Sequence, residues 1–294
     1  MSGRGKSPKS IALIDFAVDW FEANHPASIR ACCYQLFIHG HIDSMSKNAT
    51  SNVSRLLRDA REQGLLPWEH VTDESRDVEK TAQWRDRDSL LRAAAEQYRR
   101  DNWQDQPCRI EVWSEKGTIR GTLKPVLDEY GIAFRVMHGY SSATVLHQIA
   151  EESLRGDKPL IALYLGDWDP SGLHMSEADI PSRLARYGGR LSFNRIALLE
   201  KDTWDLPHFD AKTKSQDGRY QWFVRQHGAR CWELDAMPPR ALRERVEASI
   251  LKHMDMAAWD HSRDIEDAEL ESMEGYFNNV SSILQQASKY EAQP

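Results

Sequence analysis

The sequence predicts an α/β protein whose larger domain is a doubly wound, mostly parallel sheet with helices on both faces. The first observation is an alternation of strand-like and helix-like stretches between residues 109 and 199, which is typical of parallel sheets. The second is the run 160–165 (LIALYL), which lacks polar alternation and indicates a strand buried on both faces. The third is a group of short helical patterns before residue 72, which indicates a smaller N-terminal domain.

The composition is that of a globular protein without a membrane anchor. The chain has 294 residues, enough for two domains. No apolar run approaches the ~20 residues of a membrane-spanning helix. The four cysteines form no Cys-x-x-Cys pair, so we expect reduced, mostly buried thiols, a cytoplasmic location and no membrane partner. The net charge of −7 argues against general coating of a polyanion, so contacts with nucleic acid must come from local basic patches.

Residues 11–72 are predicted to form a winged-helix domain of the kind that binds DNA, after a disordered tail at residues 1–10. The pattern consists of three helices and a short strand, at residues 11–23, 29–38, 48–63 and 65–71. On the third helix Arg55, Arg58 and Arg61 recur every three residues and share one face, which suits contact with DNA phosphates. A solvated charged face is the alternative interpretation of these arginines.

Residues 108–200 are predicted to form the sheet domain. Its strands fall at residues 109–114, 132–137, 160–166 and 193–199, and its helices at 117–130, 142–155 and 173–187. A helical connector at residues 73–107, with a helix at 78–102, precedes this domain, and an α-rich extension at residues 201–294 follows it. The extension has a loop at 201–215, helices at 219–226, 239–254 and 265–286, and a short strand at 231–234.

Acidic residues follow two of the predicted strands. Asp167 and Asp169 come after the strand at 160–166 and lie two residues apart, on one side of an extended backbone. Two carboxylates 4 Å apart repel by roughly 4 kcal/mol at an effective dielectric constant near 20, so a hard divalent cation such as Mg²⁺ or Mn²⁺ is their expected partner. Glu115 follows the strand at 109–114 and, in a parallel sheet, shares that edge. An exposed acidic turn is the alternative.

A glutamate at the end of one strand and Asp-x-Asp at the end of a later one resemble the Toprim domain. The resemblance extends to the A subunit of type IIB topoisomerases (topoisomerase VI) and the related meiotic double-strand-break protein. Ser114-Glu115-Lys116 is similar to the Val-Glu-Lys turn of that family, Gly139-Tyr140-Ser141 to its Gly-Tyr-Pro loop, and residues 167–172 (DWDPSG) to its Asp-x-Asp-Pro-x-Gly. Ser141 departs from the family pattern. The resemblance covers roughly residues 10–72 and 109–200.

A tyrosine on the second helix matches the same family. The stretch 28–34 (SIRACCY) resembles the segment that carries its nucleophilic tyrosine, with Arg30 four positions before Tyr34. One helical turn separates these two residues, so they share a face. Because a phenol has a pKa near 10, a nucleophilic tyrosine needs a cation or a base nearby, and Arg30 is placed to supply that cation or to bind phosphate. Cys33 stands where the family often has a second aromatic residue. A tyrosine packed on an apolar helix is the alternative.

The resemblance implies a reaction and a set of roles. Tyr34 attacks a phosphodiester of double-stranded DNA and forms a 5′-phosphotyrosyl link, while Glu115, Asp167 and Asp169 hold Mg²⁺. Glu115 also passes a proton to the leaving oxygen, and Lys116 contacts a phosphate. The tyrosine of one subunit meets the metal of the other, which implies a homodimer.

The family also suggests a wider context, and two other functions fit the same residues. The chain is similar to compact relatives from phages and mobile elements, with a possible separate ATPase subunit. The first alternative is a Toprim nuclease in which a metal-activated water cuts DNA and Tyr34 is structural. The second is a non-catalytic DNA-binding module whose acidic residues hold a structural ion.

Overall fold

The computed structural model describes residues 7–72, 82–137 and 143–291. The side chains of residue 278 and of residues 280–291 are outside that description, although their backbone is helical. The chain divides into two compact units, each made of two segments. The first unit joins Met1–Arg76 to Arg109–Lys252, and the second joins Asp77–Cys108 to His253–Pro294.

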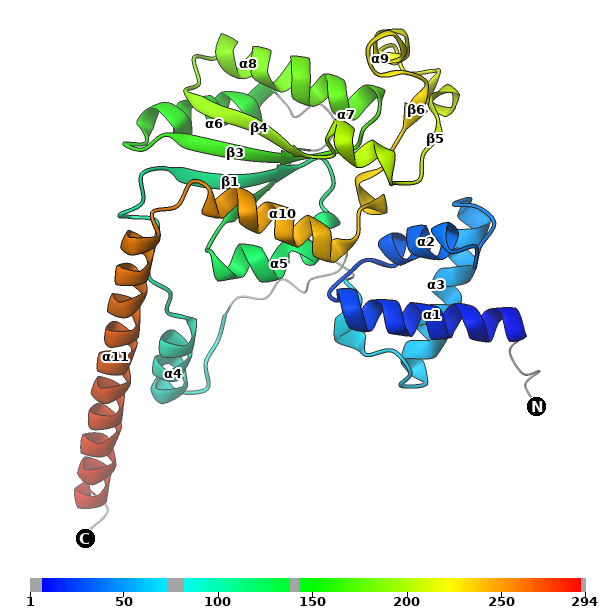
Figure 1. Ribbon diagram of the computed structural model, residues 1–294. Helices are drawn as coiled ribbons and strands as arrows, with labels where there is room; N and C mark the ends of the chain where they lie inside the picture. The colour runs from blue at the N-terminus through cyan, green and yellow to red at the C-terminus, as the bar shows by residue number, and fades with distance from the viewer. Residues whose placement is uncertain (1–6, 73–81, 138–142, 292–294) are drawn as a thin grey trace. The chain divides into compact units, whose positions relative to one another are not determined.

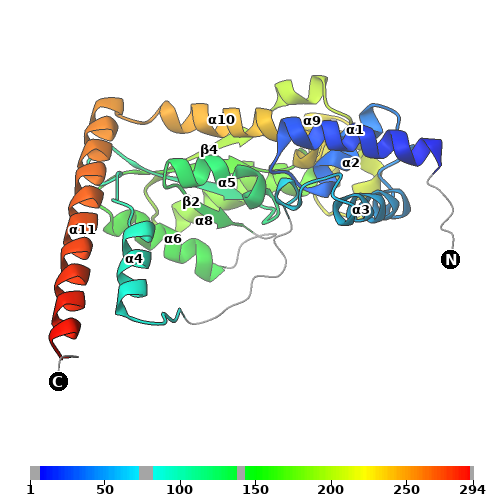
Figure 2. The same cartoon turned by 90° about the horizontal axis from the view of Figure 1, so that it is seen from below.

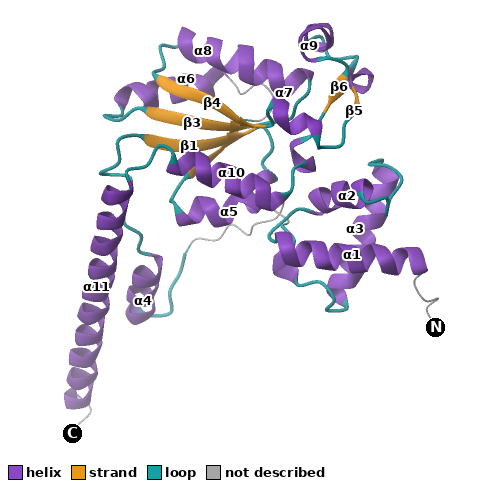
Figure 3. Cartoon of the chain, in the orientation of Figure 1, coloured by secondary structure: helices purple, strands orange, loops and turns teal. Residues whose placement is uncertain are grey.

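The core of the first unit is a parallel sheet, as the sequence predicts. Its strands are β1 (Arg109–Ser114), β2 (Ala133–Val136), β3 (Leu160–Leu165) and β4 (Leu191–Ala197). They pair in the order β2-β1-β3-β4, and every pairing is parallel. Figure 3 shows β1, β3 and β4 side by side. β3 lies in the interior of the sheet and is buried along nearly all its length, which explains its run of apolar residues.

Helices cover both faces of this sheet. They are α5 (Ile119–Glu129), α6 (Ala143–Arg155), α7 (Pro170–His174), α8 (Ile180–Arg186) and α10 (Pro239–Leu251). α5 and α10 lie side by side on one face, while α6 and α8 lie on the other (Figure 1 and Figure 2). The predicted helix at 173–187 is interrupted by a π-helical turn, Met175–Asp179, between α7 and α8.

The predicted loop at 201–215 is more structured than expected, since it contains most of the 3₁₀ turn Glu200–Trp204, the strand β5 (Phe209–Asp210) and the 3₁₀ turn Ala211–Lys214. The helix predicted at 219–226 is α9 (Tyr220–His227), and the strand predicted at 231–234 is replaced by β6 (Arg230–Cys231) and the 3₁₀ turn Leu234–Ala236. β5 and β6 pair antiparallel. Trp168, just beyond β3, forms an antiparallel bridge with Trp232, just beyond β6. This bridge brings the later segment to the edge of the sheet that bears the acidic residues.

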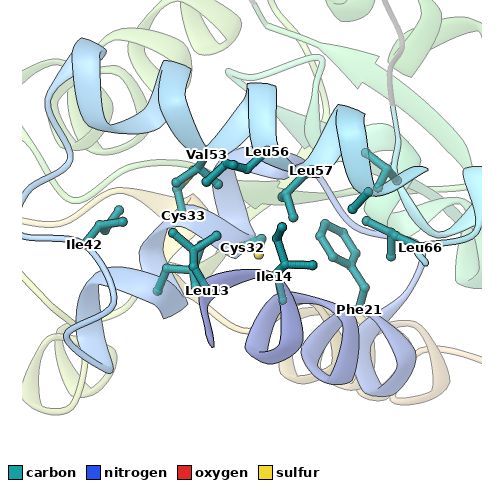
Figure 4. Close-up of a cluster of buried hydrophobic side chains, with 14 of the residues drawn as sticks. Leu13, Ile14, Phe21, Cys32, Cys33, Ile42, Val53, Leu56, Leu57 and Leu66 are labelled. Carbon is teal, nitrogen blue, oxygen red and sulfur yellow. The ribbon is translucent and has the colours of Figure 1, made fainter. Parts of the chain in front are cut away.

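Three helices form the N-terminal part of the first unit. They are α1 (Pro8–Asn24), α2 (Ile29–Ile38) and α3 (Lys47–Glu62), and each begins after a serine whose side chain accepts a backbone hydrogen bond. α1 starts within the tail that was predicted to be disordered, because Ser7 caps it and Pro8 suits a first turn. Their shared core includes Phe21, Cys32, Cys33 and Leu57 (Figure 4). All four cysteines lie among the described residues, are buried and form no disulfide.

The strand predicted at residues 65–71 is wrong. Trp68–His70 is a 3₁₀ turn, in which the backbone N–H groups of His70 and Val71 donate to the carbonyls of Pro67 and Trp68. These local bonds use the donors that a strand would direct to a neighbour. Val71 makes one isolated parallel bridge, to Ala27. The described residues therefore carry three helices and a single bridge where a β-wing was expected.

The second unit pairs α4 (Arg87–Gln97) with the long helix α11 (Met256–Glu291). The helix predicted at 78–102 is shorter in the structure: α4 covers residues 87–97, residues 82–86 and 98–102 are described but not helical, and residues 78–81 lie outside the description. The buried carboxylate of Glu266 on α11 accepts hydrogen bonds from the Asn102 side chain and the Arg100 backbone. The predicted connector thus packs against the end of the predicted extension. None of the described helices combines the length and apolar character that crossing a bilayer requires.

Candidate functional site

The carboxyl edge of the sheet brings three predicted site residues together. Glu115 directly follows β1, and Asp167 follows β3 by two residues. β1 and β3 are neighbours, and the chain continues from β1 to β2 on one side and from β3 to β4 on the other. This reversal of strand order is the position at which open α/β sheets bind ligands. Asp167 and Asp169 lie close enough to Glu115 for their charges to contribute to its raised pKa.

Arg195 of β4 holds the loop that carries both aspartates. Its guanidinium donates hydrogen bonds to the backbone carbonyls of Gly166 (2.7 Å), Asp167 (2.6 Å), Gly172 (3.2 Å) and Leu198 (2.8 Å), and to the Ser176 hydroxyl (2.6 Å). Burial lowers the pKa of Arg195. A partly buried arginine with five acceptors holds the loop rigidly, because releasing it would leave several polar groups unpaired.

Gly172 allows the same loop to fold back on itself. A Cβ atom at this position would lie 2.4 Å from the carbonyl oxygen of Asp167, which is closer than real Cβ contacts. The Gly172 N–H also donates to Oδ1 of Asp169 at 2.7 Å. The glycine in the sequence 167–172 (DWDPSG) is therefore required by close packing of the backbone.

The two carboxylate oxygens of Asp169 have different partners. It is the N-cap of α7, where Oδ1 accepts from the Gly172 N–H and from the Ser171 hydroxyl at 2.9 Å. Its other oxygen, Oδ2, lies 3.2 Å from Nζ of Lys214. The cap fixes the carboxylate, and Oδ2 remains directed toward positive charge.

Lys116 neutralises a second group of carboxylates. Its Nζ atom lies 3.0 Å from Asp167, 2.8 Å from Asp235 and 3.4 Å from Glu233. Burial by itself lowers the pKa of Lys116, but the three carboxylates outweigh it and raise that pKa above the ordinary lysine value. Asp167 also accepts from the Leu234 N–H at 2.8 Å. Lys116, predicted to contact a DNA phosphate, is paired with acidic side chains in this structure.

Glu115 differs from the two aspartates in its hydrogen bonding. Its Oε2 atom is buried and has no hydrogen-bond partner among the described residues. Burial, and then the charges of Asp167 and Asp169, raise the pKa of Glu115 to about 7. Such an oxygen is costly in an apolar surrounding unless a proton or a cation joins it.

The donor chemistry at this edge fits a hard divalent cation. Glu115, Asp167 and Asp169 offer carboxylate oxygens, which Mg²⁺ and Mn²⁺ prefer, and one of these oxygens is buried and unpartnered. Within the described ranges, no three ligating side chains stand in a ready-made metal-binding arrangement. Instead, Lys116 and Lys214 lie beside the two aspartates. A cation would take over the charge compensation that these ammonium groups provide.

Tyr34 lies on the side of α2 that faces this acidic region. Ser28 caps α2 by accepting from the Ala31 N–H at 3.1 Å, and Arg30 lies with its guanidinium 5.7 Å from the Tyr34 ring centre. Tyr34 is only 6% exposed, yet Cys32 and Cys33, not Tyr34, belong to the core of the helical part. Arg30 forms an ion pair with Glu233 and lies 3.5 Å from Asp235.

The surroundings of Tyr34 favour the neutral phenol. Burial and the charge of Glu233 raise the pKa of Tyr34 above its ordinary value, although Arg30 and Lys116 act in the opposite direction. The predicted influence of Arg30 is therefore present, but it does not produce a phenolate in this state.

A pocket of about 450 Å³ is lined both by α2 and by the segment after β4. Its lining includes Tyr34 and Arg30 from α2, and Lys214, Glu233 and Phe209 from the segment after β4. Sequence reasoning missed Arg195, Lys214, Glu233 and Asp235. A sequence signal for two of them was present: Glu233-Leu234-Asp235 is an acid-x-acid pattern at the end of the strand predicted at 231–234, and it resembles the Asp167–Asp169 pattern that follows the strand at 160–166.

The three arginines of α3 do not form a bare basic stripe. Arg58 lies 2.8 Å from Asp59 and 3.7 Å from Glu62, and Arg55 lies 3.7 Å from Asp59. Arg61 stacks on the ring of Trp68, at 4.2 Å from its centre. Arg61 thus has a packing role, and two acidic side chains on the same helix reduce the positive charge of the other two.

Comparison with models of known protein families and with curated proteins finds no match to this chain. The predicted Gly139-Tyr140-Ser141 loop lies outside the described residues. Any assignment of function to this chain therefore depends on the geometry around its acidic residues.

Replacing Gly172 by alanine should destabilise the first unit. The new Cβ would collide with the Asp167 carbonyl, so we expect the free energy of unfolding to fall by about 1 to 3 kcal/mol in denaturant titrations. Gly218→Ala is the matched control, because no atom lies within 4 Å of its added Cβ. Equal stability of the two variants would contradict the tight turn.

Replacing Glu115 by glutamine should change how stability depends on pH. Because folding raises the pKa of Glu115 to about 7, the folded chain binds more protons than the unfolded chain between pH 4.5 and 7, and the wild type loses stability as pH rises through this interval. Without divalent ions, E115Q should be more stable than the wild type by roughly 3 kcal/mol at pH 8, and the gain should vanish near pH 4. Thermal unfolding of both proteins from pH 4 to 8 measures this difference in stability.

The surface variant Glu129→Gln serves as the control, since Glu129 is exposed. A gain for E115Q that stays constant from pH 4 to 8 would show that the Glu115 charge is not the cause. Adding Mg²⁺ at pH 8 should raise the melting temperature of the wild type more than that of E115Q.

Proposed function

We propose that this chain is a metal-dependent DNA-cleaving enzyme that resembles the A subunit of type IIB topoisomerases. In this proposal the sheet is a Toprim-like domain, and the three N-terminal helices are a winged-helix-like domain that binds double-stranded DNA. The observation that carries the proposal is the buried, unpartnered oxygen of Glu115 beside Asp167 and Asp169 at the switch point of the sheet. Structural ion pairs alone give no reason to leave such an oxygen without a partner.

Tyr34 is the proposed nucleophile. Its oxygen forms a bond to the phosphorus of a DNA phosphodiester, the bond from phosphorus to the 3′-oxygen breaks, and the 5′ end becomes linked to the protein. The phenol proton goes to solvent, and the leaving 3′-oxygen takes a proton from Glu115.

The neighbours of Tyr34 supply part of what this attack needs. Arg30 and Lys116 lower the pKa of Tyr34, whereas burial and Glu233 raise it. A bound phosphate competes with Glu233 for Arg30, which orients the phosphate toward the tyrosine. A divalent cation held by Glu115, Asp167 and Asp169 supplies positive charge against the charge that develops on the phosphate oxygens.

A hydrolytic nuclease is the second candidate, and the raised pKa of Tyr34 favours it. A buried neutral phenol is a weak nucleophile, and in this alternative Tyr34 only packs beside the pocket while water attacks the phosphate. The two candidates differ in their product, because only the first leaves protein attached to DNA. A homodimer and a separate ATPase subunit belong to the first candidate.

Tyr34→Phe should abolish the covalent adduct and the cleavage. The substitution removes only the attacking oxygen, so binding to a labelled duplex in gel-shift assays should stay within about twofold of the wild type, and denaturing gels with Mg²⁺ or Mn²⁺ should show no protein-linked DNA. Tyr130→Phe is the control, since Tyr130 lies at the C-terminal end of α5 and its hydroxyl contacts Glu247. Continued cutting by Y34F would identify the hydrolytic nuclease.

Asp169→Asn and Asp169→Ala should separate the structural role of Asp169 from its chemical one. Asparagine caps a helix about as well as aspartate, so D169N should keep the wild-type stability, while D169A should lose about 1 kcal/mol. Both should lose metal-dependent cleavage by about 10²-fold or more, because the negative charge is gone. Cleavage rates compared with melting curves test this. Near-normal cleavage by D169N would exclude Asp169 as a ligand.

A further inference from the structure

We infer that Tyr34 acts together with the acidic residues of its own chain, so that one chain contains a complete cleavage site. This inference rests on the proposed function. It departs from the arrangement that the family resemblance implies, in which the tyrosine of one subunit meets the metal of another. The contacts that support it all lie within the first unit.

A short series of contacts links Tyr34 to the acidic residues of the same chain. Arg30, whose guanidinium lies 5.7 Å from the Tyr34 ring centre, is paired with Glu233. Glu233 lies 3.4 Å from the Lys116 ammonium, which lies 3.0 Å from Asp167. Lys116 and Asp235 are also close enough to Tyr34 for their charges to influence its pKa. Three side chains therefore separate the tyrosine from the aspartate.

The pocket lined by Tyr34 includes a lysine that pairs with Asp169, although neither aspartate lines the pocket itself. Lys214 lines this pocket, and its ammonium lies 3.2 Å from Oδ2 of Asp169. Arg30 and Lys214 contribute positive charge to the lining of the pocket, whereas Glu233 and Asp43 contribute carboxylates. A volume of about 450 Å³ accommodates a phosphodiester with its flanking sugars. Arg30 and Lys214 are the two groups placed to bind its phosphate, one on the side of Tyr34 and one beside Asp169.

One arginine connects the three N-terminal helices to the helices that cover the sheet. Arg243 of α10 donates to the backbone carbonyls of Asn24 (3.1 Å), His25 (3.2 Å) and Pro26 (3.1 Å), just before α2, and to that of Thr122 (3.3 Å) on α5. α2 also packs against the 3₁₀ turn Leu234–Ala236. These contacts set Tyr34 beside the acidic residues through the fold of a single chain.

Mixing two inactive variants tests this inference. Y34F and D169N are made with different affinity tags, expressed together and purified through both tags, so that every recovered dimer holds one chain of each kind. If Tyr34 serves its own chain, neither protomer has an intact site, and no adduct forms. If the site spans two subunits, one of the two sites is intact, and adduct returns to about half of the doubly tagged wild-type level.

Each outcome has one meaning. Doubly tagged mixtures without adduct support the inference, and so does a wild-type chain that forms adduct although no doubly tagged material can be purified. Restored adduct overturns the inference and leaves the proposed function standing. A wild-type chain that forms no adduct with Mg²⁺ or Mn²⁺ overturns the proposed function itself. Melting curves of Y34F and D169N confirm that both variants are folded.

Discussion

The ammonium group of Lys116 is the contact on which the rest of the site depends. It lies within 3.4 Å of carboxylates from Asp167, Asp235 and Glu233, which come from the loop after β3 and the segment around the 3₁₀ turn Leu234–Ala236. Buried acids are stable only when they are paired, and removing one partner from such a group costs several kcal/mol. Lys116 therefore joins three parts of the chain as well as balancing their charge.

Two arginines hold the backbone around the site in place, whereas the lysines pair with its carboxylates. Arg195 holds the carbonyls of the loop that carries Asp167 and Asp169, and Arg243 holds the carbonyls that precede α2. Both satisfy backbone groups at places where regular hydrogen bonding ends, which is where a chain most needs outside donors. The positions of Asp167 and Tyr34 are thus set by arginines that are far from either residue in sequence.

Glu115 differs from these paired carboxylates. Its buried oxygen has no partner among the described residues, and its raised pKa expresses the cost of keeping it ionised. Natural proteins retain such local instability chiefly at functional sites, where a ligand relieves it. A divalent cation would relieve it here, and the same cation would weaken the hold of Lys214 on Asp169.

The sequence by itself determined the parallel α/β sheet, the bounds of β1 and α2, and the arrival of Glu115 and Asp167 at one edge. These follow from local periodicity and from the common direction of parallel strands, which need no knowledge of distant contacts. The strand expected at 65–71 was wrong, because the N–H groups of His70 and Val71 bond within their own turn. Only the tertiary structure decided the roles of Arg195, Lys214 and Glu233. They lie on β4 and in irregular segments, where no periodicity marks a site, and their partners are set by long-range packing and by the need to pair buried charge.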